Sequence, residues 1–273
     1  MLVLLSCAKT MSAVSKVKVP LTTSPRFQKE AAEIALQMSQ FSVDELERLL
    51  RVNAKIAVEN YKRYQAFHAE ATPELPALLA YTGIVFKRLN PKDFSAEDFG
   101  YAQEHLRLTS FCYGLLRPLD VIRAYRLEGD VVLPELGNQT LFSYWRSRLT
   151  DTFIEDIRSA GGILCNLASD EMKSLFDWKR VESEVRVVTP EFHVWKNGKL
   201  ATIVVYTKMS RGEMTRFILK NKIGNPEELK GFSWEGFEFD ESLSDEKKLV
   251  YTTIVEIGRA HRLNSSHSEI SRM

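Results

Sequence analysis

The stretch from His105 to Glu128 constrains the fold more than any other part of this 273-residue chain. It interleaves apolar residues with four arginines, and the pairs Tyr113-Gly114 and Arg117-Pro118 act as hinges. Aliphatic side chains favour the interior, whereas arginines are buried only when they are paired or bind a ligand. The stretch is therefore expected to be buried along one side and to present cations along the other. Its last residues, Arg126 and Glu128, fit either an internal ion pair that fixes a loop or a group that meets a ligand.

Hydrophobic periodicity predicts both helices and strands along the chain. Helical spacing extends from residue 25 to 68, where Ser42 and Glu45 form a capping box. Further helices are predicted at about 95–108, 141–157 and 208–220. Strands are predicted at 2–5, 77–81 and 163–165, and on both sides of Asn197-Gly198, a strong hairpin signal. The length alone leaves open one large domain or two small ones.

Polar residues follow two of the predicted strands. Lys9 comes after the apolar run at 2–5, and a strand's carboxyl end is where α/β proteins commonly bind ligands. A solvated lysine in a turn is the simpler alternative, and the absence of glycines there excludes a Walker A loop. Asn166 and Ser169 follow the strand at 163–165 and suit a helix cap, with Asp170 at the positive end of that helix. Capping explains these residues without a ligand.

Composition is that of an ordinary globular protein. Hydrophobic residues make up 44% of the chain and charged residues 27%, and the formal net charge is +1. No global charge indicates a nucleic-acid or membrane partner, so any cationic surface must be local; residues 105–126 and 199–230 are the two basic regions. No apolar run reaches the roughly 20 residues of a membrane span, and no signal peptide is recognised. Three widely spaced cysteines predict neither a disulfide framework nor a zinc site, which favours a reducing, cytoplasmic location.

The last residues, 254–273, change in character. They are polar and unpatterned, resemble translated adaptor sequence, and are expected to be disordered and separate from the domain at 1–253. Outside this tail the histidines are His68, His105 and His193, which lack the spacing of metal ligands. No metal site and no cofactor are therefore expected.

Several segments together resemble the YaaA family of bacterial peroxide-stress proteins. Their order and spacing agree across roughly residues 1–253. The matching segments are Leu5-Ser-Cys-Ala-Lys-Thr10, Phe99-Gly-Tyr-Ala-Gln-Glu-His-Leu-Arg107, Tyr113-Gly-Leu-Leu-Arg-Pro-Leu-Asp120, Tyr125-Arg-Leu-Glu128, Asn166-Leu-Ala-Ser-Asp-Glu171, Tyr206-Thr-Lys208 with Arg211-Gly212, and Gly231-Phe-Ser-Trp-Glu-Gly236. The chain departs from the family pattern at Cys7, at Gly83-Ile-Val-Phe86 and at Met209.

The resemblance implies an α+β (mixed α/β) fold: one compact domain with a mixed central sheet and surrounding helices. It also implies a cytosolic protein that limits iron-driven damage and binds double-stranded DNA through a positively charged cleft with a helix-hairpin-helix element, which we assign to 99–120. No obligate protein partner is evident. The residues expected to contact DNA phosphates are Arg107, Arg117, Arg123, Arg126, Lys208, Arg211 and Arg216. Asn166, Ser169 and Asp170 are expected to be polar groups of the cleft.

An enzyme that acts on a nucleotide or a damaged base is the alternative. Lys9, Glu128 and Lys208 are then the catalytic candidates, with Arg126, Asn166, Ser169 and Arg211 in the same cleft. A lysine beside other cations can serve as a nucleophile or base. This hypothesis requires that Lys9 and Lys208 approach each other beside a concave pocket. Direct iron binding, a third hypothesis, lacks a suitable cluster of ligands in the sequence.

Overall fold

Strand β1 (Leu2–Leu5) lies between two parallel strands of the main sheet, β3 (Leu106–Ser110) and β8 (Ile163–Asn166). In the pairing register, Val3 lies opposite Leu106 on one side and Cys165 on the other. All four residues of β1 are buried, because helices cover both faces of a parallel sheet. This is why the run is uniformly apolar instead of alternating. The structure is a computed structural model and describes residues 1–254.

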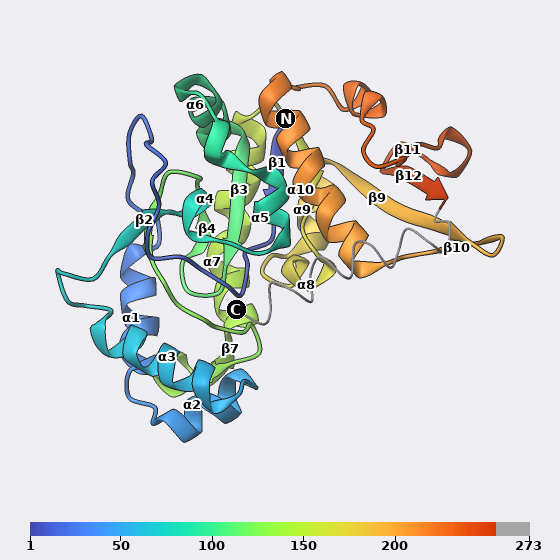
Figure 1. Cartoon of the computed structure of the whole chain (residues 1–273). Helices are drawn as coiled ribbons and strands as arrows, with labels where there is room; N and C mark the ends of the chain where they lie inside the picture. The colour runs from blue at the N-terminus through green and yellow to red at the C-terminus, as the bar shows by residue number, and fades with distance from the viewer. Residues whose placement is uncertain (255–273) are drawn as a thin grey trace.

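The main sheet has the strand order β11-β12-β9-β8-β1-β3-β4, and β10 pairs with β9 (Figure 1). Its remaining strands are β4 (Gly114–Leu116), β9 (Arg186–Lys196), β10 (Lys199–Ala201), β11 (Glu238–Phe239) and β12 (Lys248–Ile254). The strands from β12 to β3 run parallel, and antiparallel pairs occur at both edges and in the β9–β10 hairpin. The hairpin prediction is confirmed: Asn197 and Gly198 form the turn, both with positive φ.

Two short antiparallel pairs lie outside the main sheet. They are β2 (Glu74–Pro76) with β5 (Val121–Arg123), and β6 (Val132–Leu133) with β7 (Gln139–Thr140). The β2–β5 pair ties the second half of the 105–128 stretch to the segment that follows the N-terminal helices.

Helices complete the fold on both faces of the sheet. They are α1 (Gln28–Met38), α2 (Val43–Leu50), α3 (Ala54–Ala66), α4 (Ala77–Ala80), α5 (Ile84–Leu89), α6 (Ala96–His105), α7 (Leu141–Ser159), α8 (Asp170–Lys173), α9 (Trp178–Glu184) and α10 (Val204–Asn221). Short 3-10 helices are η1 (Pro91–Asp93), η2 (Pro134–Leu136), η3 (Pro226–Gly231) and η4 (Glu241–Leu243). In Figure 1, α5 and α10 lie in front of the sheet, α7 lies behind it, and α1, α2 and α3 gather at the lower left. This arrangement confirms the expected mixed α/β domain.

Two local expectations have different outcomes. The capping box at Ser42 is confirmed, because the Ser42 side chain accepts from the Glu45 N–H and the Glu45 side chain accepts from the Ser42 N–H. The strand predicted at 77–81 is wrong, because residues Ala77–Ala80 form the single turn of α4. That run is buried on all sides, and periodicity alone cannot distinguish a buried strand from a buried helix turn.

The region 99–120, where we expected a helix-hairpin-helix element, contains one helix and two strands. Helix α6 ends at His105 and continues directly into β3, which pairs with β4. Gly114 opens β4 with a φ of +69°, and a Cβ there would lie 2.7 Å from the Trp145 ring. The helix is therefore followed by a β-hairpin within this region.

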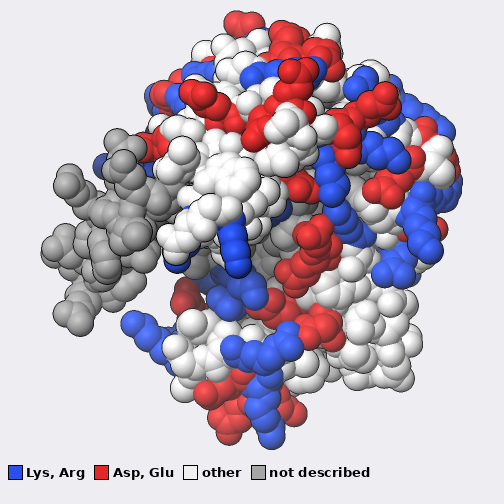
Figure 2. Space-filling view, turned by 90° about the vertical axis from the view of Figure 1, so that its right-hand side faces the viewer, with Lys and Arg blue, Asp and Glu red and all other residues white. Residues whose placement is uncertain are grey.

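Basic and acidic side chains are interleaved on the face shown in Figure 2, which is the β9–β12 side of the molecule. Within residues 1–254, no helix combines the length and the apolar character that crossing a membrane requires. The tail that we expected to be disordered, 254–273, lies outside the described residues except for Ile254, which is the last residue of β12.

Candidate functional site

A pocket of about 320 Å³ opens at the carboxyl end of β1. Its walls come from the turn after β1, the first residues of α5, residues 125–127, the turn after β8 and the N-terminal half of α10. Adjacent parallel strands end at the same edge of a sheet, so the turns after β1 and β8 meet there. The volume is at the lower end of the range for small-molecule sites. Lys9 and Lys208 both line this pocket, so the two lysines face one concave surface.

A buried carboxylate organises the cations of the pocket. Lys9 Nζ donates to both carboxylate oxygens of Glu128, at 2.9 and 2.7 Å. Arg126 lies on the other side, with Nη2 3.7 Å from Glu128 Oε1. The Glu128 side chain is 6% exposed whereas that of Lys9 is 59% exposed. The two interpretations of Arg126 and Glu128 are thus compatible, because the ion pair exists and Arg126 also lines the pocket.

Hydroxyl groups join the turns after β1 and β8. The Ser169 N–H donates to Ser6 Oγ at 2.9 Å, and the two hydroxyl oxygens are 3.3 Å apart. Ser169 occupies the N-cap position of α8, but its side chain makes no capping hydrogen bond. Asn166 accepts from the Ala168 N–H at 3.2 Å, and Asp170 is exposed and pairs with Lys173. Ser6 and Ser169 line the pocket, whereas Asn166 and Asp170 do not.

Buried donors without a partner concentrate at this site. Among the described residues, the buried side-chain atoms that lack a hydrogen-bond partner are Arg126 Nε, Asn166 Nδ2, Ser210 Oγ and Arg211 Nε. Arg126 and Arg211 both line the pocket. Burial lowers the pKa of Arg211, against the opposing effect of the Asp170 carboxylate. Since buried polar groups are nearly always satisfied, these guanidinium groups indicate an acceptor-rich or anionic ligand.

Apolar side chains form another part of the pocket lining, here called the apolar wall. Phe86, Phe111, Tyr125 and Met172 contribute to it. The Tyr125 hydroxyl is buried behind the wall, 2.6 Å from Ser110 Oγ and 2.8 Å from the Tyr81 hydroxyl, so the tyrosine ring is held rigidly. A pocket lined by both apolar and cationic side chains suits a ligand that carries a flat ring and an anionic group.

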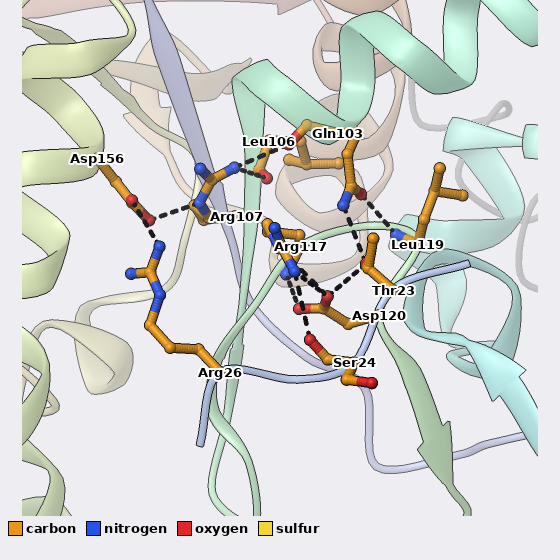
Figure 3. A network of polar contacts seen from close by, with 10 residues as sticks. All are labelled: Thr23, Ser24, Arg26, Gln103, Leu106, Arg107, Arg117, Leu119, Asp120 and Asp156. Atoms are coloured by element: carbon orange, nitrogen blue, oxygen red, sulfur yellow. Dashed lines mark hydrogen bonds and ion pairs between the residues drawn. The ribbon is translucent and has the colours of Figure 1, made fainter. Parts of the chain in front are cut away.

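Two arginines expected to contact DNA belong to an internal network, shown in Figure 3. Arg107 is buried; its Nε donates to Asp156 at 2.7 Å, and its Nη1 donates to two main-chain carbonyls. Arg26 binds the other oxygen of Asp156 at 3.1 Å. Arg117 pairs with the buried Asp120 at 3.0 Å and also donates to the Ser24 carbonyl. These contacts tie the segment before α1 to β3 and to the turn after β4.

Two further arginines of the expected set are also paired. Arg123 binds Glu74 at 3.0 Å and the Phe67 carbonyl, and Arg216 Nη1 binds Asp93 at 2.8 Å. The structure therefore brings Arg126, Lys208 and Arg211 together at the pocket and places Arg107, Arg117, Arg123 and Arg216 in ion pairs elsewhere.

Sequence reasoning missed Ser6 and the apolar wall. Ser6 has a recognisable signal, because it is the first residue after a buried strand. The aromatic wall has none, because Phe86, Phe111 and Tyr125 come from three distant segments and look like core residues. Within residues 1–254, no group of three or more His, Cys, Asp or Glu side chains is arranged to hold a metal ion.

Comparison with known proteins places this site in a family context. A family model described as "Peroxide stress protein YaaA" matches residues 1–243. A UPF0246 protein of Bacteroides thetaiotaomicron is 98% identical over 251 residues, covering 92% of this chain and 98% of the relative. UPF0246 proteins of Phocaeicola vulgatus and Crocosphaera subtropica are 62% and 37% identical, each over 92% or more of this chain and 99% or more of the relative. The chain belongs to the peroxide stress protein YaaA family.

Proposed function

We propose that this protein acts in peroxide stress by binding a phosphate-bearing nucleotide in the pocket at the end of β1. The phosphate faces Lys9, Arg126, Lys208 and Arg211, and the base lies against the apolar wall. The observation that carries the proposal is the pair of buried arginine Nε donors, on Arg126 and Arg211, that lack a partner and line one pocket. Guanidinium groups match phosphate geometry and are rarely left unsatisfied.

Titration calorimetry with adenosine monophosphate, adenosine and inorganic phosphate tests this proposal. The monophosphate is expected to bind more tightly than either fragment, because it engages both walls. Lys9→Ala and Arg211→Ala are each expected to weaken it about tenfold, the loss typical of one charge-assisted hydrogen bond. Lys62→Ala is the matched control, an exposed lysine on α3 far from the pocket in the sequence. Equal affinity of the native protein and both pocket variants would contradict the proposal.

Double-stranded DNA is a second candidate as the source of the nucleotide. Lys9 and Lys208 are exposed at the pocket, where they can reach a DNA phosphate. A damaged nucleotide is more easily extruded from a duplex than a paired one. Occupying the pocket with that nucleotide would limit iron-driven damage by shielding it from oxidants generated at iron.

Duplex binding is measured by fluorescence anisotropy with a 20-base-pair DNA, with and without one 8-oxoguanine. The DNA hypothesis predicts a steep loss of affinity with salt, and a loss with Lys208→Ala and with Lys9→Ala. Protection is measured as strand nicking by Fe²⁺ and peroxide. Duplex affinity that changes with none of salt, Lys208→Ala or Lys9→Ala would leave the free nucleotide as the ligand.

Catalysis on the bound nucleotide has one specific observation in its favour. Glu128 holds the Lys9 ammonium group at 2.7 and 2.9 Å beside the pocket, which fixes the position of a candidate proton donor to the ligand. Catalysis is tested by incubating the protein with damaged and with normal nucleotides and separating any products by chromatography. Turnover is expected to vanish in Lys9→Ala; turnover that survives this change would exclude Lys9 as the reacting group.

A further inference from the structure

A second hollow, a groove of about 950 Å³, lies between the loop that follows β1 and the segment from α4 to η1. In Figure 1 the loop is the dark blue arch at the left, between β1 and α1. Residues 12–18 form one side of the groove. Leu78, Phe86 and Phe94 contribute to its floor, and Val14, which is 78% exposed, projects an apolar side chain at its rim.

The groove is separated from the nucleotide pocket by paired main chain. Thr82 N–H donates to the Thr10 carbonyl at 3.0 Å, and Ser12 N–H donates to the Ala80 carbonyl at 2.8 Å. Thr10 lines the pocket and Ser12 lines the groove, and Phe86 is the one described residue that lines both hollows. The groove is therefore a neighbouring surface whose lysines are not among the residues proposed to bind a nucleotide.

The charge of the groove has one sign. Four lysines line it: Lys16 and Lys18 on the loop, and Lys87 and Lys92 on the opposite side. All four are exposed, and none forms an ion pair with another described residue. The residues that line the groove include no aspartate or glutamate. A ligand of negative charge would thus meet complementary charge on both sides.

The main chain of the loop has free hydrogen-bonding groups. Within the described chain, backbone–backbone bonds anchor the loop at Ser12, and at Thr23, whose N–H donates to the Leu119 carbonyl at 2.9 Å. Between these anchors no such bond occurs, although two serine hydroxyls accept from the Val14 and Val17 N–H groups. The Ser12 hydroxyl also donates to the Val14 carbonyl at 2.7 Å. The remaining main-chain groups of the loop, which bond to no other described residue, can pair with an extended chain.

We propose that this groove binds an extended, acidic segment of a partner protein. The partner's backbone pairs with the loop, its apolar side chains contact the floor, and its carboxylates meet the four lysines. A single nucleic-acid strand is a poorer fit, because it has no main-chain N–H and C=O groups that could pair with the backbone of the loop as an extended peptide does.

The test uses a fluorescein-labelled eight-residue peptide that alternates glutamate with valine, titrated with the full chain. Binding is expected to weaken at least about tenfold in the double variant Lys16→Ala/Lys18→Ala, since two charge contacts are lost. Lys62→Ala/Lys179→Ala, which removes two exposed lysines elsewhere, is expected to leave it unchanged. Methylating alternate amides of the peptide removes its backbone donors and is expected to weaken binding as well.

Three outcomes would overturn the proposal. Peptide affinity equal in the native protein and Lys16→Ala/Lys18→Ala would exclude the groove. Tighter binding of oligothymidylate, with the same dependence on these lysines, would make it a nucleic-acid site. Self-association at higher concentration that requires Lys16 and Lys18 would make the occupant a second copy of this chain. Adenosine monophosphate affinity is measured on the same variants, so failure of the groove and failure of the pocket are distinguished.

Discussion

Cys7 lines the pocket between Ser6 and Lys9, a position that would suit a peroxide-reactive thiol. Its surroundings, however, make this thiol less reactive. Burial raises the pKa of the Cys7 thiol to about 12, and the negative charges of Glu171 and Glu128 act in the same direction. The thiolate is the form that reacts with peroxide and alkylating agents. Cys7 therefore stays protonated at neutral pH, and Lys9 remains the reactive candidate of this turn.

Alkylation measures this difference. At about pH 8 the native protein is expected to react with iodoacetamide at Cys7 on the order of a thousandfold more slowly than an ordinary exposed cysteine, because the thiolate fraction falls tenfold per pKa unit. Peptide mapping by mass spectrometry separates Cys7 from the buried Cys112 and Cys165. Unfolding in urea should restore normal rates at all three. Rapid labelling of Cys7 in the folded protein would show that its thiol is activated.

At the scale of elements, the pocket depends on how closely α10 approaches α5. Gly212 on α10 permits this approach: a Cβ there would lie 2.3 Å from the Val85 carbonyl oxygen and 2.8 Å from Arg88 Cβ. The neighbouring Glu213 is 3.7 Å from Arg88 across the same contact. Since Val85 and Arg211 both line the pocket, the distance between these helices sets its width.

Gly212→Ala is expected to destabilise the protein by about 2 kcal/mol, because a methyl group pressed against a main-chain oxygen forces the helices apart. Nucleotide affinity should also fall in Gly212→Ala, because the distance between α5 and α10 sets the width of the pocket. Gly100→Ala on α6 is the control: nothing lies within 4 Å of its Cβ, and alanine favours a helix, so stability should rise by about 0.5–1 kcal/mol. The free energy of unfolding of each variant is measured by urea denaturation. A Gly212→Ala protein as stable as the native one would refute the close-approach argument.

At the scale of the whole molecule, Asp98 joins the beginning of α6 to the end of α10. Lys220 and Lys222 both donate to its carboxylate, and Ser95 N–H also does so in a capping box. Burial by itself raises the pKa of Asp98, but the hydrogen bonds from the two lysines outweigh it and hold the pKa well below the usual range. The carboxylate therefore contributes stability while it is ionised, and that contribution is lost on protonation.

Asp98→Asn is expected to lower the free energy of unfolding by about 2 kcal/mol at neutral pH, through loss of hydrogen bonds between charged groups. Because the folded-state pKa is depressed, the unfolded chain takes up the proton first, near its ordinary value of 3.8. The difference between native and variant should thus be constant above about pH 5 and shrink as pH falls below 4. Urea denaturation across this pH range measures the difference in the free energy of unfolding. Asp44→Asn, at an exposed position, is the control. A difference that persists undiminished at low pH would contradict this account.

The sequence by itself determined the features that depend on a few neighbouring residues. The Asn197-Gly198 turn needs positive φ at two positions, and the Ser42 capping box satisfies N–H groups three residues away, so both are readable locally. The turn after β1 could be proposed as a ligand site for the same reason. The ion-pair partners of individual side chains could not be predicted, because they are distant in the sequence. Lys9 and Glu128 are 119 residues apart, and Arg107 and Asp156 are 49 residues apart. An arginine among apolar residues must be paired or meet a ligand, but which of these occurs depends on the carboxylates that tertiary packing brings within reach. Packing gave Arg107 such a carboxylate and left the Nε atoms of Arg126 and Arg211 without a partner at the pocket.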